Sequence, residues 1–131
     1  MAQGNFYNLE IYKIARQLSS VAWIAYISMN WNTKKTIGNQ FIESIDSIGA
    51  NIAESCGRYH YLDKIKFLYN SRGSYYEAIL HWTELLYERG LIEERHYTQI
   101  IAQSNIFIPK LNSYINSLYK SKQLDNKPAH N

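Results

Sequence analysis

Cysteine, proline and glycine are all scarce in this sequence. Its 131 residues include one cysteine (Cys56), two prolines and six glycines. A lone cysteine excludes an internal disulfide framework and a cysteine-based zinc site. The few prolines and glycines exclude collagen-like and low-complexity chains, and a hydrophobic content of 46% excludes a disordered one.

Long hydrophobic runs are also missing. The longest apolar-rich stretch, Val21–Ile27, is far shorter than the ~20 residues that a membrane helix needs. The opening residues, MAQGNF, lack the basic segment followed by an apolar one that is typical of a signal peptide. We therefore expect a soluble, cytoplasmic protein with no membrane partner.

Four stretches carry apolar residues three and four positions apart, as amphipathic helices do. The pattern predicts helices over about 8–29, 36–56, 62–89 and 93–119, with the polar segment NWNTKK as a break after the first. No run alternates with period two for long enough to predict a strand. Gly57 follows the second helix at the position that tolerates positive φ. Pro109 predicts a kink in the last helix, with a break into two shorter helices as the alternative.

Short connections between four helices predict an all-α fold. The expected architecture is an antiparallel up-down-up-down four-helix bundle over residues 1–120, followed by a polar, flexible C-terminal tail over 121–131. The chain also has twelve tyrosines and three tryptophans, more than one bundle core needs. Because tyrosine suits half-buried and interfacial positions, this surplus predicts a homo-oligomer.

The up-down order gathers charge at one end of the bundle, which we call the basic pole. The net charge of the chain is only +3, yet this pole collects nine cations and four carboxylates: Lys13, Arg16, Arg58, Lys64, Lys66, Arg72, Lys120, Lys122 and Lys127 against Glu10, Glu54, Asp63 and Asp125. Clustered cations are the electrostatic footprint of phosphate binding. RNA or DNA is therefore a predicted partner, and an ordinary solvated helix end is the alternative.

Six cations are the candidate nucleic-acid contacts. Arg58, Lys64, Lys66 and Arg72 come first, and Lys13 and Arg16 second. Three tyrosines fall near the pole and are able to stack on unpaired bases: Tyr59, Tyr61 and Tyr69.

Two further segments combine small and polar residues at helical spacing. Ser47, Asn51, Glu54 and Arg58 form a polar stripe beside the small residues Gly49, Ala50 and Ala53. Gly73 lies inside the third predicted helix, where glycine costs about 1 kcal/mol relative to alanine. We expect it to face the small residues of the second helix, so that Asn51 and Glu54 meet Arg72 or Ser74.

These two segments resemble the family of four-helix-bundle proteins encoded in intervening sequences of bacterial 23S ribosomal RNA genes. The first is similar to the motif S-I-x-x-N-I-A-E-x-x-G-R at Ser47, Ile48, Asn51, Ile52, Ala53, Glu54, Gly57 and Arg58. The second is similar to F-L-x-x-x-x-G-S-x-x-E at Phe67, Leu68, Gly73, Ser74 and Glu77. The opening resembles F-x-x-L-x-I/V-Y/W-x-x-A at Phe6, Leu9, Ile11, Tyr12 and Ala15.

The resemblance implies a ribosomal protein-like homopentamer without enzymatic activity. It also implies a polar network of family-motif residues: Ser47, Asn51, Glu54, Gly73, Ser74 and Glu77. A related branch is the accessory variability determinant of diversity-generating retroelements, which implies a reverse transcriptase as a further partner. The mild overall charge of this chain departs from that branch.

Catalytic and metal signatures are weak. A di-iron bundle needs two Glu-x-x-His motifs, and this chain has only Glu93-x-x-His96, at a helix start. Cys56 and His60 lack a third orienting residue, and no phosphate-binding glycine loop is present. We predict no enzyme, no cofactor and no metal; the alternative to nucleic-acid binding is a protein-interaction scaffold.

Overall fold

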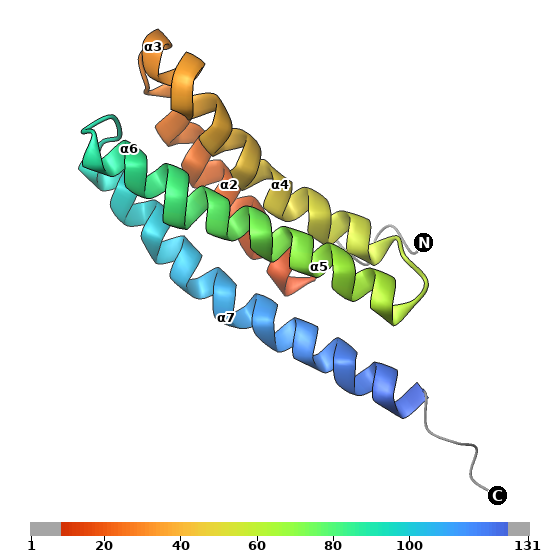
Figure 1. The fold of residues 1–131 in the computed structure, drawn as a ribbon. Coiled ribbons are helices and arrows are strands. Elements are labelled where there is room, and N and C mark those ends of the chain that lie inside the picture. The colour runs from red at the N-terminus through yellow and green to blue at the C-terminus, as the bar shows by residue number, and fades with distance from the viewer. Residues whose placement is uncertain (1–8, 126–131) are drawn as a thin grey trace, which may run out of the picture.

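A computed structural model of the chain describes residues 9–125. Within them lie four long helices and no strand (Figure 1). The first is α2 (Glu10–Ile27). The second helix consists of α3 (Trp31–Thr33), the π-helical η1 (Lys34–Gly38) and α4 (Asn39–Cys56) in succession. The third helix consists of α5 (Tyr61–Tyr76), the π-helical η2 (Glu77–Thr83) and α6 (Glu84–Glu88). The fourth helix is α7 (Glu94–Asp125). The predicted all-α four-helix bundle is confirmed.

The order of the helices around the bundle decides which surfaces are neighbours. α2 packs against α4 and α7, and α5 packs against the same two helices. α2 and α5 therefore occupy opposite corners. Figure 1 shows α2 beside α4, and the turn from α4 to α5 at the end where α2 begins.

Apolar side chains three and four residues apart fill the space between the four helices. Leu18, Phe41, Leu68 and Phe107, one from each helix, have no exposed surface. Burying one such side chain contributes about 1.5–3 kcal/mol, which holds the helices together without disulfides. No helix among residues 9–125 has the length and hydrophobicity of a membrane span.

Two predicted details of the connections are wrong. The segment NWNTKK is not a break, because Asn30 caps a helix that begins at Trp31: its side chain accepts a hydrogen bond of 2.9 Å from the Thr33 amide. Gly57 does not take positive φ; its φ is −79°, and its amide stays bonded to the last turn of α4. Gly90, with φ of 66°, makes the left-handed turn before α7.

The last helix is longer than predicted. α7 passes through Pro109 without the break into two helices that was the alternative, and Phe107 and Leu111 on either side of Pro109 are fully buried in one core. The kink at Pro109 stays a prediction. It also continues to Asp125, so the first five residues of the predicted tail are helical. The rest of that tail, Lys127 included, and Phe6 of the opening motif lie outside the described residues.

Candidate functional site

The polar family-motif residues form one small network instead of a continuous one. Ser74 of α5 donates a hydrogen bond of 3.0 Å to the Ser47 hydroxyl of α4. Asn51 donates to the main-chain carbonyl and the hydroxyl of Ser47, at 2.9 and 3.0 Å. Ser47 is thus the residue that meets Ser74, in place of the predicted Asn51 and Glu54. The network ties α4 to α5 at a half-buried position.

The remaining motif residues serve other contacts. Glu54 pairs with Arg58 one turn along the chain, and Glu77 accepts a hydrogen bond of 2.7 Å from the Trp82 indole. Arg72 crosses to α7 and donates to the Asn112 side chain at 3.0 Å.

Gly73 is exposed and does not face α4, which corrects our prediction. A Cβ added there would have no neighbour within 4 Å among the described residues. Besides Ser74, the small residue Ser71 of α5 faces α4; it is fully buried and donates a 2.8 Å hydrogen bond to the Ile48 carbonyl. Gly49 faces α2 instead, where a Cβ would lie 3.8 Å from the Ala15 Cβ.

Two predicted cations share one aromatic ring at the basic pole. The Arg58 guanidinium lies 4.5 Å from the centre of the Phe67 ring, and the Lys66 ammonium lies 5.7 Å from it. Such cation–π contacts hold exposed cations in place without neutralising them. Tyr59, which is 90% exposed, stands in the same α4–α5 turn. These residues are the best-assembled part of the predicted nucleic-acid interface.

Lys64 has a structural contact in the same turn. It is half-buried, and its ammonium group donates to the Ser55 carbonyl near the end of α4, at 3.4 Å. The Ser55 hydroxyl in turn donates to the Lys64 carbonyl at 3.0 Å. A lysine at this place satisfies a terminal carbonyl and the negative end of the helix dipole.

Arg72 stands further along α5, in an aromatic setting that the sequence does not reveal. Its guanidinium lies 4.7 Å from the centre of the Tyr69 ring, and the Tyr69 hydroxyl lies 2.9 Å from that of Tyr119 on α7. The bond to Tyr69 raises the pKa of Tyr119. Tyr119 reaches Tyr69 and Arg72 only because α5 and α7 pack in this antiparallel register. The spacing of residues within either helix therefore does not predict this contact.

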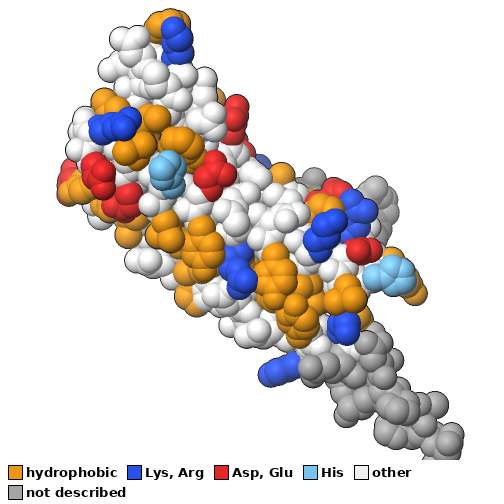
Figure 2. Space-filling view, in the orientation of Figure 1, with side chains coloured by type: hydrophobic (Ala, Val, Ile, Leu, Met, Phe, Trp, Pro, Cys, Tyr) orange, Lys and Arg blue, Asp and Glu red, His pale blue; other side chains and the backbone are white. Residues whose placement is uncertain are grey.

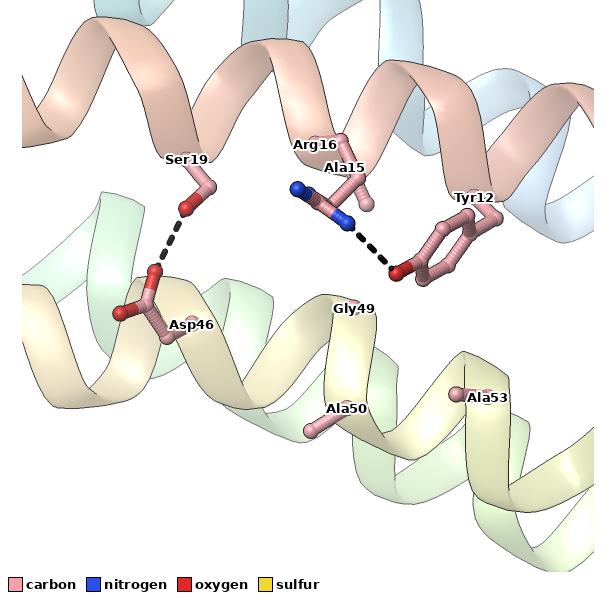
Figure 3. A pocket seen from close by; sticks show the side chains of 8 residues that line it. All are labelled: Tyr12, Ala15, Arg16, Ser19, Asp46, Gly49, Ala50 and Ala53. Atoms are coloured by element: carbon pink, nitrogen blue, oxygen red, sulfur yellow. Dashed lines mark hydrogen bonds between the residues drawn. The ribbon is translucent and has the colours of Figure 1, made fainter. Parts of the chain in front are cut away.

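Lys13 and Arg16 lie on α2, at the corner of the bundle opposite α5. Arg16 donates to the Tyr12 hydroxyl at 2.9 Å and lines a groove of about 320 Å³ between α2 and α4. Figure 3 shows this groove, with the small residues Gly49, Ala50 and Ala53 on α4. The second-choice cations thus lie on a different corner of the bundle from Lys66 and Arg72, which belong to α5.

The charges on the visible face differ between the two ends of the bundle. Figure 2 shows mostly Lys and Arg side chains, with acidic surface among them, near the α4–α5 turn, and mostly Asp and Glu side chains, with Lys or Arg among them, around α6. Exposed hydrophobic side chains run between the two ends along α5. This face is therefore electrostatically polarised.

The residues considered for catalysis or metal binding do not come together as a catalytic or metal-binding group. Burial raises the pKa of the Cys56 thiol, the opposite of what an activated nucleophile needs, although Lys64 lowers it in part. His60 is exposed and its ring packs edge-on against Tyr59. Glu93 and His96 lie 3.4 Å apart, but within residues 9–125 no third metal-binding side chain joins them.

Comparison with known families identifies the chain. A family model described as the 23S rRNA-intervening sequence protein matches residues 7–113. This chain belongs to that family. The match contains both motif segments and confirms the resemblance seen in the sequence. No curated protein matches the chain.

The surfaces described above lie in the part of the chain that matches the family. The matched region runs from the residues before α2 to beyond the middle of α7, so the α4–α5 turn, the α2–α4 groove and the Ser47–Ser74 contact all lie within it.

Proposed function

We propose that this member of the 23S rRNA-intervening sequence protein family is a cytoplasmic, non-enzymatic pentamer that binds RNA or other nucleic acid through its basic pole. The observation that carries the proposal is the pairing of Arg58 and Lys66 over the Phe67 ring, beside the exposed Tyr59. Cations displace counterions from phosphates, and an exposed tyrosine stacks on any base. Binding of this kind is tolerant of sequence.

The ion pair of Arg58 with Glu54 does not remove Arg58 from the proposed interface. Both side chains are about half exposed, 43% and 51%. Exposed ion pairs are worth about 0–1 kcal/mol, whereas a phosphate offers an arginine two parallel hydrogen bonds. Arg58 therefore exchanges a weak partner for a stronger one when nucleic acid binds.

The test is a titration of fluorescent single-stranded RNA and double-stranded DNA at several salt concentrations. The wild-type chain binds at low salt, and the logarithm of its affinity falls linearly with the logarithm of the salt concentration. Lys66→Glu weakens binding and makes this slope shallower by about 1. Lys35→Glu is the matched control, because it reverses an exposed lysine at the other end of the bundle and leaves binding nearly unchanged. Absence of salt-dependent binding by the wild-type chain contradicts the proposal.

The alternative function is a protein-interaction scaffold. The exposed hydrophobic side chains favour it, among them Trp31 at 69% and Leu80 at 64% exposure. A contact of that kind is insensitive to Lys66→Glu and to salt. The assembly itself is tested by light scattering, where a particle of 15.4 kDa at micromolar concentration contradicts the pentamer.

A further inference from the structure

Gly73 has no role that a single copy of the chain explains. It lies in the middle of the third helix, is exposed, and has open space where its Cβ would be. Glycine at such a position costs about 1 kcal/mol relative to alanine. Glycine on an outer helix surface lets the backbone of another molecule approach closely. Contact with a second molecule would therefore explain why this position is a glycine.

The residues around Gly73 form a second apolar stripe on the third helix. Tyr69, Tyr76 and Leu80 are 39%, 44% and 64% exposed, and with Gly73 they follow one another by four, three and four residues. We call these four residues the outer stripe. The same helix already buries Ile65, Leu68 and Tyr75 in the core. A helix that is apolar on two sides is suited to burial on both.

The groove between α2 and α4 has the complementary shape. Its floor consists of small side chains, Ala15 with Gly49, Ala50 and Ala53, and its volume of about 320 Å³ is sufficient for large side chains of another helix. The Trp23 ring, 51% exposed, stacks on Tyr26, and Tyr26 bonds to Asn39 of α4, so an aromatic surface extends along the same pair of helices.

The charges beside the two surfaces are opposite in their balance. Two carboxylates, Glu43 and Asp46, are exposed on α4 beside the groove, and one cation, Arg16, also lines it. Two cations, Lys66 and Arg72, flank the outer stripe, and one exposed carboxylate, Glu77, lies between Gly73 and Leu80 on the same helix. Among the described contacts Asp46 bonds only to the neutral Ser19, and no carboxylate within residues 9–125 lies at ion-pair distance from Lys66 or Arg72. Opposite charges at the rim set the register of two docking surfaces.

We propose that the outer stripe of one copy docks in the α2–α4 groove of a second copy. The stripe and the groove lie on different sides of the bundle, so each copy offers both, and the contact is head-to-tail. Repetition of such a contact closes a ring when the rotation between copies allows it. This inference rests on the oligomer in the proposed function. It shares Lys66 and Arg72 with the proposed nucleic-acid interface, and its test uses substitutions at other residues and no nucleic acid.

Cysteine cross-linking between two variants tests the contact directly. In a Cys56→Ser background, Gly73→Cys and Ala50→Cys are made in chains that carry tags of different mass, and the two are refolded together and oxidised. We expect a disulfide-linked heterodimer from the mixture and none from either variant alone. Ser113→Cys, exposed on α7, replaces Gly73→Cys in the matched control and gives no cross-link with Ala50→Cys.

Steric blocking of the stripe gives a second measurement. Gly73→Trp fills the space that the neighbouring copy requires and raises the dissociation constant of the assembly at least about tenfold. Asn105→Trp, on the exposed side of α7, leaves it unchanged. Circular dichroism verifies that both variants keep their helices.

The outcomes separate this inference from the proposed function. A stable oligomer by light scattering, with no heterodimer and no effect of Gly73→Trp, overturns the docking surfaces and leaves the oligomer intact. A single-copy particle overturns both. A heterodimer together with weakened assembly in Gly73→Trp supports the contact whatever the RNA titration shows.

Discussion

The Ser71 hydroxyl of α5 donates a 2.8 Å hydrogen bond to the main-chain carbonyl of Ile48 in α4. Ser71 is fully buried, and the carbonyl it reaches belongs to the middle of the neighbouring helix. A small polar side chain at this place brings the two helices close and satisfies its own hydroxyl at the same time. The bond fixes the register of α4 against α5.

Ser71→Ala is therefore expected to lower the free energy of unfolding by about 1 kcal/mol, since one buried hydrogen bond is lost. Ser113→Ala on the exposed side of α7 is the matched control, because it makes the same gain in helix propensity without losing a described contact. Urea denaturation of both variants measures the difference. Equal midpoints for the two would show that the buried bond contributes nothing.

Two buried glycines should respond differently to an added methyl group. At Gly38 a Cβ would lie 3.0 Å from the Thr33 carbonyl oxygen and 3.1 Å from the Met29 sulfur. At Gly49 the nearest atoms are at 3.8 Å, an ordinary contact distance. Gly38→Ala is expected to destabilise the fold by about 1–2 kcal/mol because the backbone oxygen cannot move away.

Gly49→Ala is the control and is expected to keep or raise the melting temperature, because alanine is the better helix former. Thermal denaturation followed by circular dichroism compares the two variants. Equal melting temperatures would contradict the close packing around the η1 segment.

Tyr97 makes the stability of the fold depend on pH in the alkaline range. Its hydroxyl donates a 2.6 Å hydrogen bond to Glu84, and this bond raises the pKa of Tyr97 to about 12. A phenol with a raised pKa in the folded state holds its proton more tightly there than in the unfolded chain, where it titrates near 10. Its contribution to stability is complete below pH 10 and is lost as the pH rises toward 12.

Tyr97→Phe should therefore make the fall in unfolding free energy between pH 10 and 12 shallower. Urea denaturation at several alkaline pH values measures it. Tyr59→Phe, at an exposed ring, is the control and should keep the wild-type slope. Identical slopes for all three proteins would show that the Glu84–Tyr97 bond is absent in solution.

Substitutions of Lys64 and Lys66, two residues apart, should differ in their effect on stability, because Lys64 has a structural contact and Lys66 is assigned to binding. Lys64→Met removes the contact with the Ser55 carbonyl and should cost about 0.5–1 kcal/mol of stability. Lys66→Met leaves the fold unchanged, because the Lys66 ammonium contacts only the Phe67 ring among the described residues. Chemical denaturation is the measurement, and the reverse order of effects would contradict these assignments.

Much of the fold follows from the sequence because the apolar spacing predicts four helices and the short connections between them predict their antiparallel order. The details that depend on contacts between helices do not follow. Gly73 and Ser71 are both small and two residues apart, and only the packed bundle shows that Ser71 faces α4 while Gly73 faces outward. The second helix begins at Trp31 because the Asn30 side chain caps it with one hydrogen bond. The polar composition of this segment is typical of a loop, so the sequence alone predicts a later start.

The same limit applies to the candidate interface. Charge counting predicts a basic pole, but it does not distinguish Lys64, which contacts a helix terminus, from Lys66, which is exposed. Nor does it reveal that α2 and α5 occupy opposite corners, which separates Lys13 and Arg16 from Arg72.

Removal of the carboxylate beside Arg58 should strengthen nucleic-acid binding. Glu54→Gln releases Arg58 from its ion pair and leaves the guanidinium over the Phe67 ring, where it is available to bind a phosphate. We expect the affinity for single-stranded RNA at low salt to rise several-fold, with a steeper dependence on salt. Glu93→Gln is the matched control: it removes one charge and releases Arg95, but at the start of α7, at the other end of the bundle. A gain of equal size in the two variants would show that only net charge matters and that Arg58 has no special place in the interface.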